Sequence, residues 1–284
     1  MDDLWHQLFN FDNYGELIVL VRNSIIAGAI LGLVGGLIGV FVISRDLAFA
    51  VHWVSELSFA GASAGLLLGI GVVEGSLVGA MIAAVIIGAL GSRARDRNSV
   101  IAVLMPFGLG LGILCLSLYD GRSANKFGLL TGQIVAVDNP RLTSMMVISG
   151  IVLVGLAIAW RPLTFISTDP EVAAARGVPN LALSLYFMVL LGLATAVSVQ
   201  IVGSLLVLSI LVTPAAAAVR VSSSPVLVPV LSVVFAVTSV VGGIMLALGG
   251  SIPISPYVTT ISFLIYLGCR LFAAVRPTRL AART

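Results

Sequence analysis

Charged residues are scarce in this chain. Asp, Glu, Lys and Arg make up 10% of its 284 residues, against 59% hydrophobic residues and a mean hydropathy of +1.16. Soluble domains carry about 25% charged residues, so the composition excludes an ordinary soluble domain. Apolar runs of about 18 residues or more recur from residue 22 almost to the end, which predicts an all-α, polytopic helical bundle in membrane lipid rather than a barrel. The net charge of +3 is small. We interpret the excess of basic residues as a signal of membrane topology and expect no nucleic acid as a partner.

Motifs for nucleotide binding and catalysis are also lacking. There is no G-x-x-x-x-G-K-[ST] sequence, and the single lysine, Lys126, stands between Asn125 and Phe127, which excludes ATP binding by a P-loop. No H-E-x-x-H or G-x-S-x-G sequence occurs, and two histidines leave little material for an intramembrane enzyme. We therefore expect that the chain is not an enzyme. If it pumps a substrate, the energy must come from ions or from another subunit. The two cysteines, Cys115 and Cys269, lie in apolar stretches and are expected to be packing residues.

The chain divides into three expected parts. Residues 1–21 contain four acidic residues and no basic start, so we expect an interfacial segment and no cleavable signal peptide. Residues 22–275 form the expected transmembrane domain, and residues 276–284 a cytoplasmic tail. About nine transmembrane helices (eight to ten) are expected, over 22–43, 47–70, 73–91, 99–118, 141–160, 181–199, 201–219, 225–248 and 255–274.

Basic residues predict the orientation of this bundle. If the chain crosses the membrane nine times, eleven basic residues fall in alternate loops on one side: Arg45, Arg93, Arg95, Arg97, Arg161, Arg176, Arg220, Arg270, Arg276, Arg279 and Arg283. The other side has only Arg22, Arg122, Lys126 and Arg141. Because positive residues concentrate in cytoplasmic loops, we expect the N-terminus outside and the C-terminus in the cytoplasm.

Two ionisable residues interrupt the apolar stretch 47–69. His52 and Glu56 are four positions apart, so they share one face of a helix. An ionisable residue inside a membrane span costs about 2.5–3.5 kcal/mol on insertion scales and tends to face the bundle interior or a water-filled pathway. One imidazole and one carboxylate predict a cation site; they suit several divalent ions, including zinc and manganese. A hydrogen-bonded pair that only pins helices together is the alternative.

Two connections are too long for simple turns. Residues 120–138 contain an apolar patch after Gly132, which predicts a short re-entrant or interfacial helix on the outer side. In the 165–180 segment, Ser167, Thr168 or Asp169 can cap a helix, Pro170 suits its first position, and Gly177 ends it. Such a short cytoplasmic helix is not stable alone, so we expect it to dock on another protein. A plain linker is the alternative.

Small and polar residues recur inside the predicted spans. Glycines at four-residue spacing, such as Gly61-Gly65-Gly69 and Gly75-Gly79, predict closely packed helices. Pro214 is expected to kink the seventh helix. Weaker candidates for polar contacts with a substrate are Ser198, Gln200, Ser204, Ser209 and Thr213.

These motifs resemble one family, the ABC-3 type permeases of ABC importers for zinc, manganese or iron, from about residue 20 to 275. The sequence D-P-E-x-A-x-x-x-G-x-P is intact over 169–179, and a late V-G-x-L-L-V motif is similar to residues 202–207. The family's second helix is similar to residues 45–65, although the family places Asp before His where this chain has His52 before Glu56. Leu130 to Val137 resembles the family's outer segment.

The resemblance implies a function and partners. The chain would be the permease of a divalent metal importer in a bacterial plasma membrane, with no permanent cofactor and Mn²⁺ or Zn²⁺ as transported substrate. His52 and Glu56 would bind the ion between two permease chains of a homodimer, after delivery by an extracellular metal-binding protein. A cytoplasmic ABC ATPase would dock on the coupling residues Asp169, Pro170, Glu171, Ala174, Gly177 and Pro179. A permease for a metal chelate, and a secondary transporter or channel without an ATPase, remain the alternatives.

Overall fold

The computed structural model describes residues 14–89, 94–120, 137–248 and 253–275, and these ranges contain helices and no strand. The all-helical prediction is therefore confirmed. The helices are α2 (Tyr14–Leu20), α3 (Arg22–Ser44), α4 (Ala48–Leu68), α5 (Val72–Ala89), α6 (Ala94–Leu118), α8 (Asn139–Thr168), α9 (Pro170–Ala175), α10 (Asn180–Val202), the 3₁₀ helix η2 (Ser204–Leu206), α11 (Val207–Leu211), α12 (Thr213–Val221), α13 (Leu227–Ala247) and α14 (Ile254–Val275).

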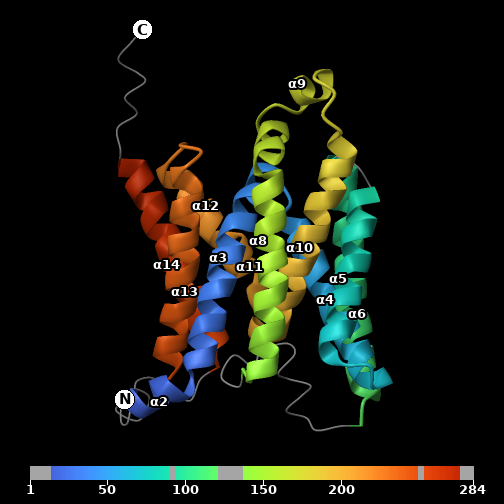
Figure 1. Cartoon of the computed structure of the whole chain (residues 1–284), viewed down its shortest axis with the longest axis vertical. Helices are drawn as coiled ribbons and strands as arrows, with labels where there is room; N and C mark the ends of the chain where they lie inside the picture. The colour runs from blue at the N-terminus through green and yellow to red at the C-terminus, as the bar shows by residue number, and fades with distance from the viewer. Residues whose placement is uncertain (1–13, 90–93, 121–136, 249–252, 276–284) are drawn as a thin grey trace.

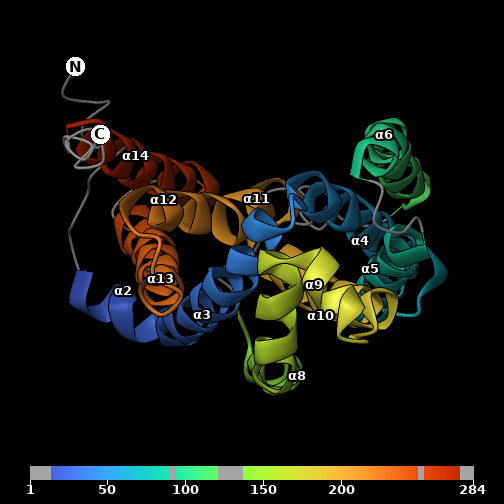
Figure 2. The ribbon, with the colours of Figure 1, turned by 90° about the horizontal axis from the view of Figure 1, so that it is seen from above.

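The long helices run side by side in two groups (Figures 1 and 2). In one group, α3 packs on α13, and α12 packs on both α13 and α14. In the other, α4 packs between α5 and α6, and α10 packs on α5. Helix α8 lies against α3 and α10, while α11 contacts both α3 and α4 and so joins the two groups. Helix α4 thus lies inside the bundle, with neighbours on several sides.

Seven of the described helices are long and apolar enough to cross a membrane: α3, α5, α6, α8, α10, α13 and α14. The predicted count of nine is not confirmed. Helix α4 has the length, 21 residues, but His52, Glu56 and three serines lower its hydropathy. The predicted span 201–219 is not one helix.

The chain breaks twice within that predicted span. Helix α10 continues to Val202 and ends at Gly203, whose φ of 79° lies in the left-handed region that favours glycine. A second break falls at Val212, directly before the turn that contains Pro214. Proline has no N–H to continue the helical hydrogen bonds, so the predicted distortion at Pro214 takes the form of a new helix start. The continuous helix expected over 201–219 was wrong, because the chain turns at Gly203 and a new helix begins after Val212.

Glycines bring the helices into close contact, as their spacing predicts. A Cβ atom added to Gly61 of α4 would collide with the carbonyl oxygen of Gly75 in α5. Gly36 of α3 lies equally close to α13, where an added Cβ would be 2.6 Å from the Cα of Val233. Gly112 of α6 faces the ring of Phe59 in α4. The contacts of Gly61 and Gly112 hold α4 closely between α5 and α6.

Three expectations concern residues that the structure does not describe. The re-entrant helix expected within 120–138 falls mostly on residues 121–136, which lie outside the described ranges. So do most of the interfacial segment 1–21 and the tail 276–284.

Helix α8 is described completely and runs to Thr168, past its predicted end at residue 160.

Candidate metal centre

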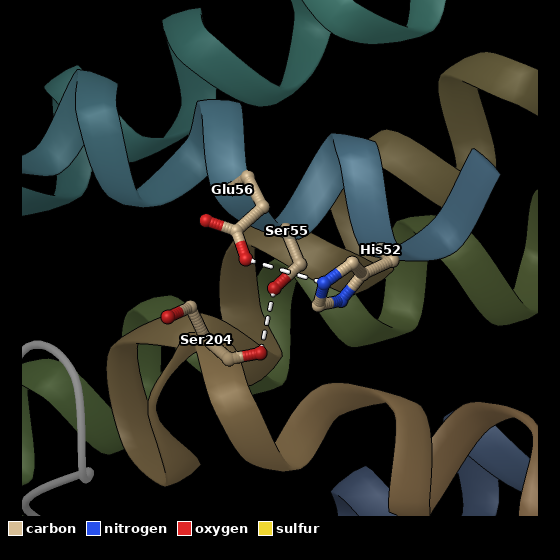
Figure 3. A network of polar contacts seen from close by, with 4 residues as sticks. All are labelled: His52, Ser55, Glu56 and Ser204. Carbon is tan, nitrogen blue, oxygen red and sulfur yellow. Dashed lines mark hydrogen bonds and ion pairs between the residues drawn. The ribbon is translucent and has the colours of Figure 1, made fainter. Parts of the chain in front are cut away.

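His52 and Glu56 lie together on one face of α4 (Figure 3). The Nε2 atom of His52 is 3.4 Å from the Oε1 atom of Glu56, and the two side chains are 28% and 4% exposed. The four-residue spacing places the imidazole one turn before the carboxylate, as the sequence predicts. One nitrogen ligand and one carboxylate therefore meet inside the bundle.

Each of the two side chains keeps one buried atom without a hydrogen-bond partner. For Glu56 this atom is Oε2, and for His52 it is Nδ1. A carboxylate buried among apolar helices is costly unless its oxygens are hydrogen-bonded or bind a cation. The unused carboxylate oxygen is thus positioned to accept either a proton or a metal ion.

Glycine on α6 makes room for the pair. A Cβ atom at Gly108 would lie 3.3 Å from both the Cβ of Glu56 and the ring of Trp53. The α6 backbone therefore passes directly over this turn of α4. It covers the Cβ side of Glu56 without adding a side chain there.

The opposite side is formed by the break after α10. The Ser55 hydroxyl donates a hydrogen bond of 2.8 Å to the carbonyl oxygen of Ser204, at the start of η2. This bond holds the residue next to Glu56 against a segment 149 positions further along the chain. No local sequence pattern connects Ser55 to Ser204, so Ser55 was not among the predicted site residues. Ser204 was only a weak candidate.

One chain offers few strong metal ligands at this place. Across the ranges that the structure describes, no three His, Cys, Asp or Glu residues gather closely enough to hold a metal ion together. His52 and Glu56 are two candidate ligands per chain. Both cysteines are free, so no disulfide joins Cys115 and Cys269.

The remaining polar candidates have different surroundings. Ser198 donates to the carbonyl oxygen of Ala194 within α10, a local bond of 2.8 Å. The Ser209 carbonyl accepts from Ser262 of α14. The amide nitrogen of Gln200 is buried without a partner, and Thr213 is the first residue of α12.

The predicted coupling residues form a short, exposed helix. Asp169 caps α9 by accepting a hydrogen bond of 3.0 Å from the backbone N–H of Val172, and Pro170 takes the first helical position. Gly177, with φ of 76°, ends the turn. The sequence prediction of a capped helix is confirmed. Glu171 and Ala174 are exposed on it, Pro179 precedes α10, and only Ala173 is buried.

An ionisable pair on a largely buried helix of a membrane-spanning bundle is typical of transport proteins. The chain belongs to the ABC 3 transport family, whose model matches residues 18–273. The family predicted from the sequence is thereby confirmed.

Similar proteins include metal transporters of several bacteria. The chain is 28% identical over 225 residues to the manganese transport system membrane protein MntC of Halalkalibacterium halodurans, covering 79% of this chain and 77% of that protein. It is 28% identical over 199 residues to the manganese import system permease protein ScaB of Streptococcus parasanguinis, covering 70% and 71%. It is 25% identical over 225 residues to the high-affinity zinc uptake system membrane protein ZnuB of Haemophilus influenzae, covering 79% and 86%.

Solved structures share the fold. A chain of PsaBC from Streptococcus pneumoniae, solved in complex with Fab, superposes with a TM-score of 0.82 at 24% identity, covering 91% of this chain and 95% of that chain. An inward-facing putative metal-chelate type ABC transporter superposes with a TM-score of 0.65 at 16% identity, covering 91% and 98%. The likeness to PsaBC is the stronger of these two.

Proposed function

We propose that this chain is the permease subunit of an ATP-driven importer of divalent transition metal ions, manganese or zinc, and that the ion passes through a site at His52 and Glu56. The observation that carries this proposal is the buried pair itself, with unused ligand atoms at Glu56 Oε2 and His52 Nδ1. Family membership and the manganese and zinc relatives support it.

A second copy of the chain completes the site in this proposal. Two ligands from one chain are too few to enclose a metal ion, which usually takes four or more. Two copies whose α4 helices meet at the His52 side, where the imidazole is 28% exposed, supply two imidazoles and two carboxylates. An incomplete site in each chain also suits transport, because the ion has to leave.

The proposed partners dock at opposite ends of the bundle. A cytoplasmic ATPase contacts α9, where Glu171 and Ala174 are exposed. A metal-binding protein delivers the ion to the other end, where α3 and α8 begin (Figure 1). Glu56 balances the positive charge of the ion inside the membrane, and a proton replaces the metal when the site is empty.

The test is metal uptake by the reconstituted transporter. The chain is placed in liposomes with its ATPase, and the metal-loaded binding protein is added with radioactive manganese or zinc. We expect Glu56→Gln and His52→Gln to lower the initial uptake rate at least about tenfold, because each removes a metal ligand but leaves a side chain of comparable size.

The matched control is Ser63→Ala on the same helix. Ser63 is buried and bonds only to the carbonyl of Phe59 one turn earlier, so uptake should stay near the wild-type rate. Co-purification of the ATPase with each variant shows that the complex is intact. Undiminished uptake by both ligand variants with the ATPase bound would disprove the metal site.

A metal-chelate permease is the second candidate, because the chain also shares its fold with a putative metal-chelate type transporter. In a chelate the chelator already fills the coordination sphere of the metal ion, so the protein does not need to supply a ligand for its passage. Uptake of chelated metal that persists in Glu56→Gln and His52→Gln, with no uptake of the bare ion by the wild type, would favour this alternative.

A further inference from the structure

Ser204 has a buried hydroxyl group that no other group uses. The residue is 1% exposed, and its Oγ atom has no hydrogen-bond partner. Its carbonyl oxygen, in contrast, accepts the bond from Ser55. A hydroxyl that is buried without a partner costs about 1–3 kcal/mol, a cost that a bound ligand would offset.

The break in the chain places Ser204 against the turn of α4 that carries the ionisable pair. Gly203, with φ of 79° and ψ of 160°, ends α10 and directs the chain into η2. The 2.8 Å bond from Ser55 then fixes Ser204 against the turn of α4 that contains Glu56. Figure 3 shows the Ser204 side chain on the side of α4 to which the Glu56 carboxylate also points.

Two buried oxygen atoms therefore lack partners, Oε2 of Glu56 and Oγ of Ser204, on two segments that the Ser55–Ser204 bond holds together. They come from segments that are distant in the sequence, and both are buried. A cation bound there would use both oxygens together with the His52 imidazole. Neither oxygen would then remain unsatisfied.

We propose that the Ser204 hydroxyl is a third metal donor from the same chain and that it shifts the site toward manganese. The proposal rests on the function proposed above. A neutral hydroxyl oxygen is a hard ligand of the kind that suits Mn²⁺, whereas Zn²⁺ accepts nitrogen and sulfur readily. Each chain thus provides one nitrogen and two oxygen donors.

The experiment measures metal binding by the purified permease–ATPase complex, with Cys115 and Cys269 replaced by Ala. Free Mn²⁺ is followed by electron paramagnetic resonance, and Zn²⁺ is added as competitor. We expect Ser204→Ala to weaken Mn²⁺ binding about tenfold, the lower end of the loss on removing a partner of a metal site, and Zn²⁺ binding less. Ser198→Ala, another buried serine of this region, is the control and should bind both ions as the wild type does.

Ser204→Cys gives a readout that a structural role cannot produce. The side chain is almost the same size, but sulfur is a soft ligand that favours Zn²⁺ over Mn²⁺. We expect the preference to move toward Zn²⁺ and a thiolate–metal absorption band to appear on addition of Cd²⁺. The background complex without this cysteine should show no such band.

The outcomes separate this inference from the proposed function. Unchanged Mn²⁺ binding in Ser204→Ala, or no Cd²⁺ band in Ser204→Cys, overturns the role of Ser204. If Glu56→Gln loses metal binding in the same experiment, the metal site at Glu56 still stands. Unchanged binding in Glu56→Gln overturns both. Weaker Mn²⁺ binding in Ser204→Ala together with the Cd²⁺ band in Ser204→Cys supports the inference.

Discussion

Serine hydroxyls inside this bundle connect helices that are far apart in the sequence. Ser55 bonds α4 to η2, and Ser232 bonds α13 to the carbonyl of Gly36 in α3. Ser262 of α14 bonds to the carbonyl of Ser209 in α11. Such interhelical bonds contribute about 0.6 kcal/mol each in membranes. Ser204 differs from these residues because its own hydroxyl remains available.

A single residue also controls the proposed coupling helix. Replacing Asp169 with Ala removes the cap of α9, which costs about 0.5–2 kcal/mol and should fray a helix of six residues. We expect ATP-driven uptake to fall severalfold, because the ATPase loses an ordered docking surface. Metal binding at His52 and Glu56 should not change.

Asp169→Asn is the matched control, since asparagine caps helices about as well as aspartate. Uptake and ATP hydrolysis by this variant should resemble the wild type. If Asp169→Ala transported metal at the wild-type rate with ATP, α9 would not be the coupling element. A secondary transporter, which works without an ATPase, would then gain support.

At the scale of helices, α4 is the element that combines close packing with polarity. Helices α5 and α6 both approach it through glycines, and η2 and α11 contact it from the break after α10. A helix with His52 and Glu56 would be unfavourable on the lipid-facing surface. The helices packed on α4 bury most of its residues, so that Glu56 is shielded from lipid.

The glycine contact between α4 and α5 gives a stability prediction. Gly61→Ala would push the new methyl group into the carbonyl of Gly75, so the helices must separate. Overpacking of this kind costs about 1–3 kcal/mol, and we expect a lower melting temperature of the complex in detergent.

Gly150→Ala in α8 is the control for this prediction. A Cβ atom at Gly150 meets nothing within 4 Å, and alanine is the better helix former. This variant should therefore melt at or above the wild-type temperature. An unchanged melting temperature for Gly61→Ala would show that α4 and α5 tolerate a wider separation.

Local rules predicted the short-range features of these elements from the sequence. The cap at Asp169, the end of α9 at Gly177, and the shared face of His52 and Glu56 all follow from spacings of a few residues. The glycine spacing predicted the close contacts of α4 as well.

Long-range features could not be derived in this way. The Ser55–Ser204 bond joins positions 149 apart, and only the packing of α4 on η2 brings them together. The break at Gly203 was missed because a glycine in an apolar run has the same sequence pattern whether it packs or turns. Two of the expected spans are missing from the seven: polar residues lower the hydropathy of α4, and the segment 201–219 is broken at Gly203 and Val212.

The whole molecule has two distinct ends. Helix α9 and the C-terminal ends of α12 and α14 lie at one end, while α3 and α8 begin at the other (Figure 1). Arg176 follows α9, and Arg220 is in the last turn of α12, so basic residues gather at the first end. This arrangement agrees with the expected cytoplasmic position of α9, by the positive-inside rule.

Cysteine labelling tests this orientation. With Cys115 and Cys269 replaced, Val172→Cys on α9 and Asp120→Cys after α6 each introduce one exposed thiol. In cells without the ATPase, an impermeant maleimide should label Asp120→Cys from outside and Val172→Cys only in inverted vesicles. Labelling from the reverse sides would invert the orientation, and the cysteine-free chain should remain unlabelled.

Helix α10 connects the two regions to which functions are proposed above, helix α9 and the neighbourhood of His52 and Glu56. It begins at Asn180, whose side chain bonds to the Pro170 carbonyl of α9, and ends beside the Ser55–Ser204 bond. A helix of 23 residues is about 34 Å long, so a tilt of about 5° at one end moves the other end by about 3 Å. A displacement of that size is enough to break the 2.8 Å hydrogen bond between Ser55 and Ser204 at the far end. Movement of the ATPase against α9 would therefore act on the ion by leverage, opening the site without any change in the chemistry of its ligands.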